Sequence, residues 1–279
     1  MQRIDQLLAL AAQIDSPTAR LDAELLLAFV LGKPRSYLFT WPEKIISASQ
    51  QAAYLDLLER RKHGEPVAYL LGHQGFWTLD LAVAEHTLIP RADTELLVEA
   101  ALRLAGRDSD WNVLDLGTGS GALALALASE RPRWTVTGVD RIESAVALAQ
   151  HNQQQLQLAH VKFLQSHWFS ALAGQRYDLI LSNPPYIADN DPHLTQGDVR
   201  FEPLSALVSG PDGLEDIREI IEQAPTYLSG DGWLLLEHGY DQAEAVRDLL
   251  RQAGFVQVSS RRDLGGHERI SLGRFSSLP

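Results

Sequence analysis

The sequence predicts an α/β protein in which a doubly wound, mainly parallel sheet of seven strands follows a small N-terminal helical bundle. From residue 111 onward, short apolar runs alternate with helical patterns, which is typical of parallel strands joined by crossover helices. The first 70 residues show helical periodicity alone. A chain of 279 residues suits one large domain and one smaller domain, so we expect two units.

The N-terminal part predicts three helices joined by short connections. The second helix has marked ends, with Ser16 as a candidate N-cap, Pro17 at the first helical position and Gly32 at the stop. The expected spans are residues 4–14, 16–32 and 49–64. Helices connected in this way pack as an antiparallel bundle, and we assign residues 1–72 to this domain.

Residues 73–90 change character and predict a linker with a short hairpin. Glycines open the stretch, and apolar residues then alternate at Leu79, Leu81 and Val83, as in a strand. A helix is expected to follow, capped by Asp93 or Thr94. We assign residues 91–279 to the second domain.

Seven short runs in the second domain read as strands, separated by helical patterns at 143–158, 215–228 and 241–253. The expected strands are 111–116, 134–139, 161–165, 177–182, 232–238, 255–260 and 268–273. Because the last two are separated by a connection too short for a crossover helix, we expect them to pair antiparallel. In a doubly wound sheet the fourth strand lies beside the first.

Composition excludes several classes of protein. The chain has no Cys, so it has no disulfides and no thiolate metal sites, which fits a reducing cytoplasm. No apolar run approaches the ~18 residues that span a bilayer, and the N-terminus lacks the apolar core of a signal peptide. Nine histidines are scattered without a ligand spacing, so we expect no metal. We predict a cytoplasmic protein that does not bind membranes.

The net charge of −12 is unevenly distributed. Residues 1–72 carry eight basic and eight acidic residues, so the whole acidic excess lies on the larger, C-terminal part of the chain, residues 73–279. A surface of that sign repels phosphate backbones, and we therefore expect no direct binding of nucleic acid.

A glycine-rich loop follows the first strand of the second domain. The stretch "VLDLGTGSGALALALA" places Asp115 and three glycines between a strand and a helix, where open α/β sheets bind ligands. Asp140 ends the next strand, where an acid can accept both hydroxyls of a ribose. The pattern predicts an adenosine-type cofactor. A dinucleotide stays an alternative, since the loop also fits G-x-G-x-x-A, and Asp115 fits either ligand contact or hydrogen bonding to loop amides.

The stretch "LILSNPPYIADN" ends the fourth strand with a stiff loop. Residues before proline are held extended, and neither Pro184 nor Pro185 has an N–H group, so the loop is rich in acceptors. The Asn183 side-chain oxygen and the Pro184 carbonyl are expected near the glycine loop, with Tyr186 as a flat wall beside them. Two fixed acceptors suit a planar –NH2 group aimed at an electrophile, which beside such a cofactor is the methyl group of S-adenosylmethionine.

The chain resembles the PrmC/HemK family, the glutamine N5-methyltransferases of peptide-chain release factors. The resemblance is carried in order by "LLGHQGFWTLDLAV", "LIPRADTE", "VLDLGTGSG", "VTGVD", "LSNPPYI" and "LEHG". One departure is Ala92, where the family commonly has a second proline. The resemblance implies a class I S-adenosylmethionine-dependent methyltransferase fold and transfer of a methyl group to the side-chain amide of the glutamine in a Gly-Gly-Gln motif. It further implies release factors as protein partners, recognised by the helical domain, and we expect a monomer.

The resemblance also implies roles for individual residues. Cofactor binding is implied for Gly117, Thr118, Gly119, Ser120, Gly121, Asp140, Trp168 and Asn183. Substrate binding is implied for Asn183, Pro184, Pro185 and Tyr186, of which Asn183, Pro184 and Tyr186 are the catalytic candidates. Phe76 and Arg91 are candidates for lining the substrate channel, with ordinary packing as the alternative. Glu237 and His238 are candidate neighbours of the site.

Two other functions fit parts of the pattern. A nucleic-acid amino methyltransferase acting on adenine would use the same Asn-Pro-Pro-Tyr loop on a flipped base, although the acidic second domain argues against it. A domain that only senses a nucleotide would explain the glycine loop but leaves the Asn-Pro-Pro-Tyr loop and Trp168 without a role.

Overall fold

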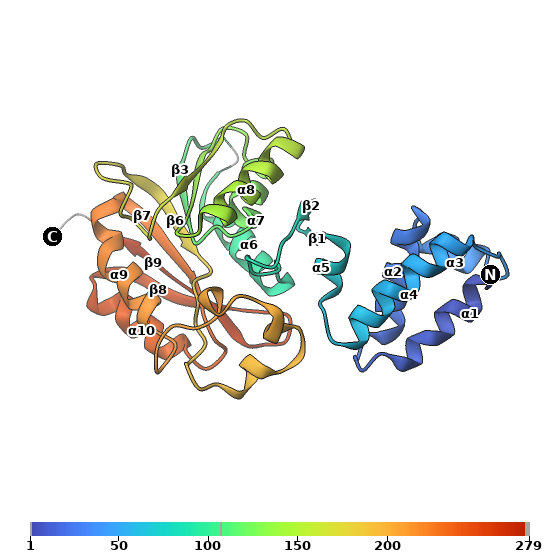
Figure 1. The fold of residues 1–279 in the computed structure, drawn as a ribbon. Coiled ribbons are helices and arrows are strands. Elements are labelled where there is room, and N and C mark those ends of the chain that lie inside the picture. The colour runs from blue at the N-terminus through green and yellow to red at the C-terminus, as the bar shows by residue number, and fades with distance from the viewer. Residues whose placement is uncertain (1, 107, 277–279) are drawn as a thin grey trace. The chain divides into compact units, whose positions relative to one another are not determined.

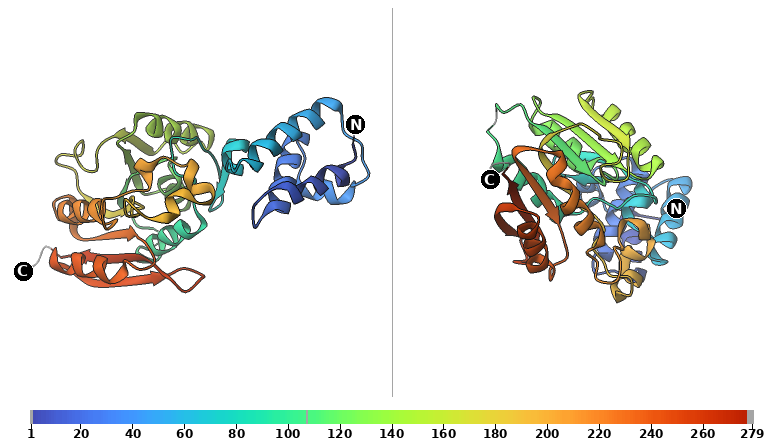
Figure 2. Two further views of the ribbon diagram at one scale, coloured as in Figure 1. Left: turned by 60° about the horizontal axis from the view of Figure 1, so that its bottom comes forward. Right: turned by 90° about the vertical axis from the view of Figure 1, so that its left-hand side faces the viewer.

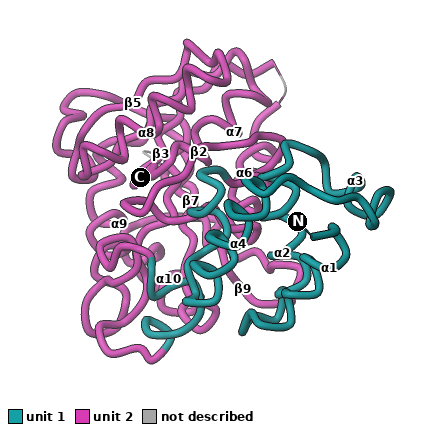
Figure 3. Tube along the Cα trace, turned by 45° about the vertical axis from the view of Figure 1, so that its right-hand side comes forward, with its two compact units in different colours: residues 1–73, 193–201 teal, residues 74–192, 202–279 magenta. Residues whose placement is uncertain are grey.

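The computed structural model describes residues 2–106 and 108–276, which form two compact units (Figures 1 and 3). The first unit contains the residues up to His73 and the separate segment His193–Phe201, shown in teal in Figure 3. The second unit contains Gln74–Pro192 and the chain from Glu202 onward. A short segment that is distant in sequence therefore packs with the N-terminal helices.

The first unit is helical, as predicted. Its helices are α1 (Ile4–Leu8), which continues as a 3₁₀ turn over Ala9–Gln13, α2 (Ala19–Leu31), α3 (Arg35–Thr40), α4 (Ala48–Lys62) and α5 (Val67–Leu71). The short helices α3 and α5 were not predicted. Gly32 ends α2 with a left-handed φ of 60°, which glycine adopts without strain.

The prediction that Ser16 caps the second helix is wrong. The helix begins at Ala19 with Thr18 at the N-cap position. The Ser16 hydroxyl instead accepts a hydrogen bond from the Thr18 backbone N–H at 3.1 Å, so it stabilises the turn before the helix.

Arg61 on α4 joins three parts of the first unit. Its side chain is 8% exposed, and its Nε donates to Asp22 Oδ2 at 2.9 Å. Its Nη1 donates to Asp198 Oδ1, also at 2.9 Å, and Asp198 belongs to the segment His193–Phe201. Because a buried charge must be paired, this ion pair holds the segment against the helices.

The second unit contains a seven-stranded sheet with the order β5-β4-β3-β6-β7-β9-β8. Its strands are β3 (Asn112–Leu116), β4 (Thr135–Asp140), β5 (Val161–Gln165), β6 (Tyr177–Ser182), β7 (Leu228–Glu237), β8 (Phe255–Arg262) and β9 (Glu268–Phe275). The first five are parallel, and β9 runs antiparallel between β7 and β8. This confirms the predicted strands, the pairing of β6 with β3, and the antiparallel last pair.

Helices cover both faces of this sheet (Figures 1 and 2). They are α6 (Glu95–Leu104), α7 (Ala122–Glu130), α8 (Glu143–Gln155), α9 (Glu215–Tyr227) and α10 (Ala243–Gln252). Alternate residues of β3 face opposite sides: Val113 packs in one apolar cluster with α6, α7 and α8, whereas Leu114 and Leu116 pack in another with α9 and α10. The doubly wound architecture follows from this alternation.

The predicted linker hairpin is present as β1 (His73–Phe76) and β2 (Leu79–Ala82). The long connection between β6 and α9 contains three 3₁₀ turns, at Pro192–Thr195, Gly197–Phe201 and Leu204–Ala206. In the part of the chain that the structure describes, no helix combines the length and the apolar character needed to cross a bilayer.

We expect Arg61→Met to destabilise the first unit by about 3 kcal/mol, because the buried Asp22 carboxylate would lose its cationic partner. Urea unfolding followed by circular dichroism measures this as a lower midpoint. Arg103→Met is the matched control, since the pair between Arg103 and Glu99 is exposed and contributes at most ~1 kcal/mol. Equal midpoints for the two variants would contradict the role of Arg61.

Candidate functional site

The site is placed by the pairing of β3 with β6. The last paired residues are Leu116 and Ser182, and the Ser182 hydroxyl donates to the Leu116 carbonyl at 2.7 Å. The two loops that follow, starting at Gly117 and Asn183, therefore leave the same edge of the sheet side by side. This is the edge at which open α/β sheets bind ligands.

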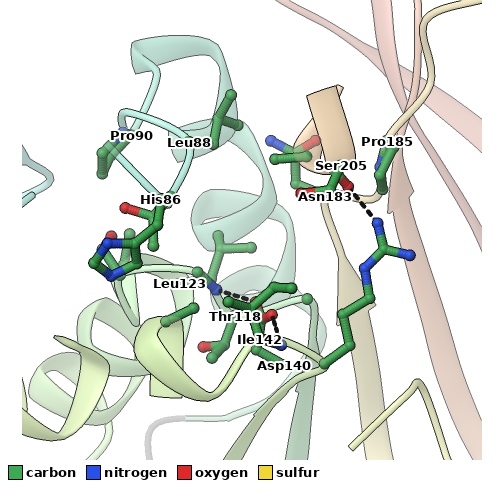
Figure 4. A pocket seen from close by; sticks show the side chains of 18 of the residues that line it. His86, Leu88, Pro90, Thr118, Leu123, Asp140, Ile142, Asn183, Pro185 and Ser205 are labelled. Atoms are coloured by element: carbon green, nitrogen blue, oxygen red, sulfur yellow. Dashed lines mark hydrogen bonds between the residues drawn. The ribbon is translucent and has the colours of Figure 1, made fainter. Parts of the chain in front are cut away.

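A pocket with about 940 Å³ of empty space, part of it open to solvent, lies at this edge (Figure 4). That size suits a cofactor-sized ligand. Its lining includes residues 117–120 of the glycine loop, but not Gly121, together with Asp140, Trp168, Asn183 and Pro185 and parts of the loops before α6 and after β6. All of these residues belong to the second unit.

The glycine loop has a backbone conformation that requires glycine. Gly117, Gly119 and Gly121 have φ angles of 70°, 54° and 86°, in the left-handed region. A side chain at Gly119 would meet nothing within 4 Å, so this residue borders open space. The loop is both a tight strand-to-helix turn and a wall of the pocket.

Asp140 is fixed at the end of β4, as the sequence predicted. Its Oδ2 accepts from the Gly119 N–H at 3.0 Å, and its Oδ1 accepts from the Ile142 N–H at 2.9 Å (Figure 4). A carboxylate can accept about four hydrogen bonds, so both oxygens keep capacity for the hydroxyls of a ligand.

Trp168 lines the pocket, and its backbone conformation is strained. Its φ of 44° is left-handed, which is rare for a bulky residue, and its carbonyl is held by the Ser166 hydroxyl at 2.8 Å. The ring lies beside Gly117, where a Cβ atom would come within 3.4 Å of it. Its buried Nε1 has no acceptor among the described residues. An unpaired buried donor with a strained backbone favours a binding role.

Asp115 is buried below the glycine loop and is not part of the pocket lining. Its Oδ2 accepts from the Thr118 hydroxyl at 2.6 Å and from the Ala124 N–H at 3.3 Å. Its Oδ1 has no partner among the described residues. Burial, assisted by the charge of Asp140, raises the pKa of Asp115 to about 7. These contacts favour hydrogen bonding within the loop over direct ligand contact.

The Asn-Pro-Pro-Tyr loop contributes two of its four residues to the pocket. Asn183 and Pro185 line it, and the Asn183 Nδ2 donates to the Thr94 hydroxyl at 3.0 Å. Pro184 is buried, and neither Pro184 nor Tyr186 is part of the lining.

Tyr186 does not form the expected wall of the pocket. The Tyr186 and Ile187 N–H groups both donate to the Leu207 carbonyl. The ring packs against the apolar cluster under α9, and its hydroxyl donates to Glu237 Oε1 at 3.4 Å.

Phe76 and Arg91 both line the pocket, and both also make contacts that are typical of structural residues. Phe76 is 1% exposed within the apolar core, and Arg91 forms an ion pair with the buried carboxylate of Glu202. Glu237 and His238 lie outside the lining, and His238 is held by the Ser271 hydroxyl at 2.9 Å.

The sequence did not predict the contacts of three structurally important residues, of which Thr94 was expected only as a helix cap. Thr94 binds Asn183, and Arg141 lines the pocket and donates to the Ser205 carbonyl at 2.7 Å. Asn152 on α8 accepts from the Ala82 N–H at 2.8 Å and donates to the Ser120 carbonyl at 2.9 Å, so it links the hairpin to the glycine loop. Each contact joins residues that are distant in sequence, so no local sequence pattern predicts it.

We expect Asp115→Asn to stabilise the protein at pH 8 but not at pH 5, in the absence of added ligand. The Asp115 pKa is about 7 in the folded protein and 3.8 ordinarily, so the folded state binds more protons between these values. Wild-type stability therefore falls as pH rises through this window. The asparagine variant lacks that loss and should be more stable by at least about 1 kcal/mol at pH 8.

Thermal unfolding of both proteins at pH 5, 6, 7 and 8 measures the difference. Glu237, whose pKa burial also raises to about 7, is present in both proteins, so its contribution cancels. A constant difference across the pH range would contradict the assignment.

Comparison with known proteins identifies both parts of the chain. Residues 4–72 match the family model described as PrmC N-terminal domain, and residues 107–260 match the model described as methyltransferase domain. The structure of a methyltransferase from Pyrococcus furiosus aligns with a TM-score of 0.55 at 18% identity, over 83% of this chain and 100% of that one. That likeness shows the fold alone.

Curated relatives match over nearly the whole chain. A release factor glutamine methyltransferase from Pseudomonas aeruginosa is 62% identical over 94% of this chain and 95% of its own length. One from Escherichia coli (strain K12) is 52% identical over 93% of this chain and 94% of its own. With the helical domain, the glycine loop and the Asn-Pro-Pro-Tyr loop all in place, the chain belongs to the PrmC family of release factor glutamine methyltransferases.

Proposed function

We propose that this protein transfers a methyl group from S-adenosylmethionine to the side-chain amide nitrogen of the glutamine in the Gly-Gly-Gln motif of peptide-chain release factors. The observation that carries the proposal is the position of Asn183, which lines the pocket beside the glycine loop and Asp140. Relatives named as release factor glutamine methyltransferases match over nearly the full chain and support the choice of substrate.

The pocket residues fit S-adenosylmethionine. Asp140 keeps acceptor capacity for the two ribose hydroxyls, and the glycine loop, Thr118 and Ser120 surround space beside the N-terminus of α7 for the carboxylate of the methionine part. The unpaired Nε1 of Trp168 supports contact with the adenine. When bound, S-adenosylmethionine supplies a methyl group on a positively charged sulfur and leaves as S-adenosylhomocysteine.

Asn183 and Pro184 bind and orient the side-chain amide of the substrate glutamine. An amide nitrogen is a poor nucleophile, because its lone pair is delocalised into the carbonyl group. The Asn183 Oδ1 and the Pro184 carbonyl accept the two hydrogens of the glutamine –NH2, which aims the nitrogen at the methyl group and weakens that delocalisation. The nitrogen gains a methyl group and releases one proton to water, so no strong base is needed.

Alignment accounts for most of the rate enhancement. Holding two reacting groups in line can lower a barrier by ~7–11 kcal/mol. A contact that strengthens only as charge develops contributes about 3 kcal/mol more. The prolines supply this alignment, because they fix the backbone of the loop before substrate binds.

The remaining candidates have supporting roles. Pro185, Phe76 and Arg91 border the path of the substrate side chain, and the pair between Arg91 and Glu202 keeps the Arg91 guanidinium in place. Tyr186 stabilises the loop through the hydrogen bond from its hydroxyl to Glu237. The helical domain, residues 1–72, recognises the release factor, and the reaction takes place in the cytoplasm, where translation occurs.

Methylation of an adenine amine in nucleic acid is the alternative. The same loop chemistry would serve it, but the acidic excess of the second domain disfavours a phosphate backbone. Incubating the protein with radiolabelled S-adenosylmethionine and, in parallel, purified release factor, total RNA and DNA separates the possibilities. We expect label in the release factor alone; label in RNA or DNA alone would overturn the proposed substrate.

We expect Asn183→Ala to lower kcat by about 10²-fold or more, because the variant loses an acceptor that acts on the developing charge. S-adenosylmethionine binding should be largely kept. Single-turnover rates and isothermal titration measure the two effects separately. Asn190→Ala, at an exposed position of the same connection, is the matched control and should behave as wild type. Near-normal turnover of Asn183→Ala would refute the role.

A further inference from the structure

The Asn-Pro-Pro-Tyr loop must be positioned from its two ends. Pro184 and Pro185 have no N–H group, so neither residue can donate a backbone hydrogen bond to a neighbouring segment. The first end is fixed by the sheet, because Ser182 is the last residue of β6 in register with β3. The other end is Tyr186, so the contacts that hold Tyr186 help to determine where the acceptor oxygens of the loop lie.

The backbone at Tyr186 is held against the connection that leads to α9. The Tyr186 and Ile187 N–H groups donate to the Leu207 carbonyl at 3.2 and 2.9 Å. The Ser209 N–H in turn donates to the Ile187 carbonyl at 2.9 Å. These contacts use the N–H group of Tyr186, and its carbonyl needs a donor from another segment.

Gln242 supplies that donor. It lies at the N-cap position of α10, and its Nε2 donates to the Tyr186 carbonyl at 3.0 Å. The same nitrogen lies 3.3 Å from the Asp212 carbonyl oxygen and 3.4 Å from the Gly213 carbonyl oxygen. One side-chain amide therefore joins the end of the Asn-Pro-Pro-Tyr loop to the connection before α9 and to the start of α10.

Backbone groups alone fix the orientation of the Gln242 carboxamide. Its Oε1 accepts from the Gly239 N–H at 2.8 Å. A backbone N–H can only donate, and a backbone carbonyl can only accept. Rotating the carboxamide by half a turn would therefore place donor against donor at Gly239 and acceptor against acceptor at Tyr186. The assignment of the two ends does not depend on the protonation state of any group.

The packing at Gly213 shows how closely these segments meet. Gly213 has a left-handed φ of 72°, which glycine adopts without strain. A Cβ atom there would lie 2.3 Å from the Tyr186 carbonyl oxygen and 2.8 Å from the Gln242 Nε2. Only glycine leaves room for the Tyr186 carbonyl to reach Gln242.

We propose that Gln242 is a positioning residue, which anchors the Tyr186 carbonyl and thereby holds the Asn183 and Pro184 oxygens where they bind the substrate amide. The inference rests on the proposed function. Gln242 is not part of the pocket lining, so it acts through the loop and not on a ligand. Because the prolines limit the rotations between Asn183 and Tyr186, a displacement at Tyr186 moves the acceptor oxygens as well.

Gln242→Glu tests the proposal, because an ionised glutamate has the same shape and can still accept from the Gly239 N–H but cannot donate to the Tyr186 carbonyl. We expect kcat for release factor methylation to fall at least about tenfold, with KM for the release factor changed less. The Kd of S-adenosylhomocysteine should stay within about twofold of wild type. Gln242→Met removes the donor without adding a charge and should lower kcat in the same way.

Hydrogen exchange measured by mass spectrometry tests the anchoring without catalysis. In both variants we expect faster exchange in residues 186–190, whose N–H groups depend on the anchored segment. Residues 117–127, in the glycine loop and α7, should exchange as in wild type.

Gln252→Glu is the matched control. It makes the same change of charge at an exposed position of α10, so kcat and hydrogen exchange should stay near the wild-type values. If Gln242→Glu does not fold, as judged by loss of S-adenosylhomocysteine binding, Gln242→Met decides alone.

The outcomes separate the inference from the proposed function. Wild-type protein that does not methylate the release factor would overturn the proposed function, whereas the exchange measurement still tests the anchoring. Active wild-type protein together with an equally active Gln242→Glu would overturn the positioning role alone. Near-normal kcat in Gln242→Met would also overturn it, because the added charge and not the lost donor would then be responsible. Parallel losses of kcat and of S-adenosylhomocysteine binding in Gln242→Met would contradict it as well, since general destabilisation would explain both.

Discussion

The parallel pairing of β3 with β6 is the constraint on which the rest of the site depends. Their register ends at Leu116 and Ser182, and the Ser182 hydroxyl secures it through the Leu116 carbonyl. The glycine loop and the Asn-Pro-Pro-Tyr loop must then start at the same edge of the sheet. A shift by one residue would turn the alternating side chains of β6 to the wrong faces, so the two apolar clusters that stabilise the sheet also fix the distance between the loops.

Several features of the site lower the stability of the folded protein. Asp115 Oδ1, Trp168 Nε1 and Glu237 Oε2 are buried and have no hydrogen-bond partner among the described residues. Each such atom costs about 1–3 kcal/mol. Trp168 adds a left-handed backbone. Such features are common where a fold serves a ligand, and these three atoms lie at or just below the carboxyl edge of the sheet. Among the described residues, the buried Nε atoms of Arg131 and Arg274 are also unpaired.

The sequence predicted most of the framework, because local patterns determine it. Alternating apolar runs located all seven strands, the glycines located a loop whose φ angles require them, and Asp140 lies where the strand end suggested. What could not be predicted depends on contacts between distant segments. The partnership of Thr94 with Asn183 and the inward turn of Tyr186 toward Glu237 arise only once the sheet has formed. The prediction that Ser16 caps α2 was wrong for a local reason, because the Ser16 hydroxyl accepts a hydrogen bond within the turn before the helix.

The central claim is that a proline-fixed loop presents two oxygens to a substrate carboxamide. The most direct test is a crystal structure of the protein with S-adenosylhomocysteine and a Gly-Gly-Gln peptide. We expect the glutamine side-chain nitrogen within about 3 Å of both the Asn183 Oδ1 and the Pro184 carbonyl oxygen, facing the sulfur of the bound product. A glutamine held by other residues, with Asn183 turned away from the sulfur, would contradict the account.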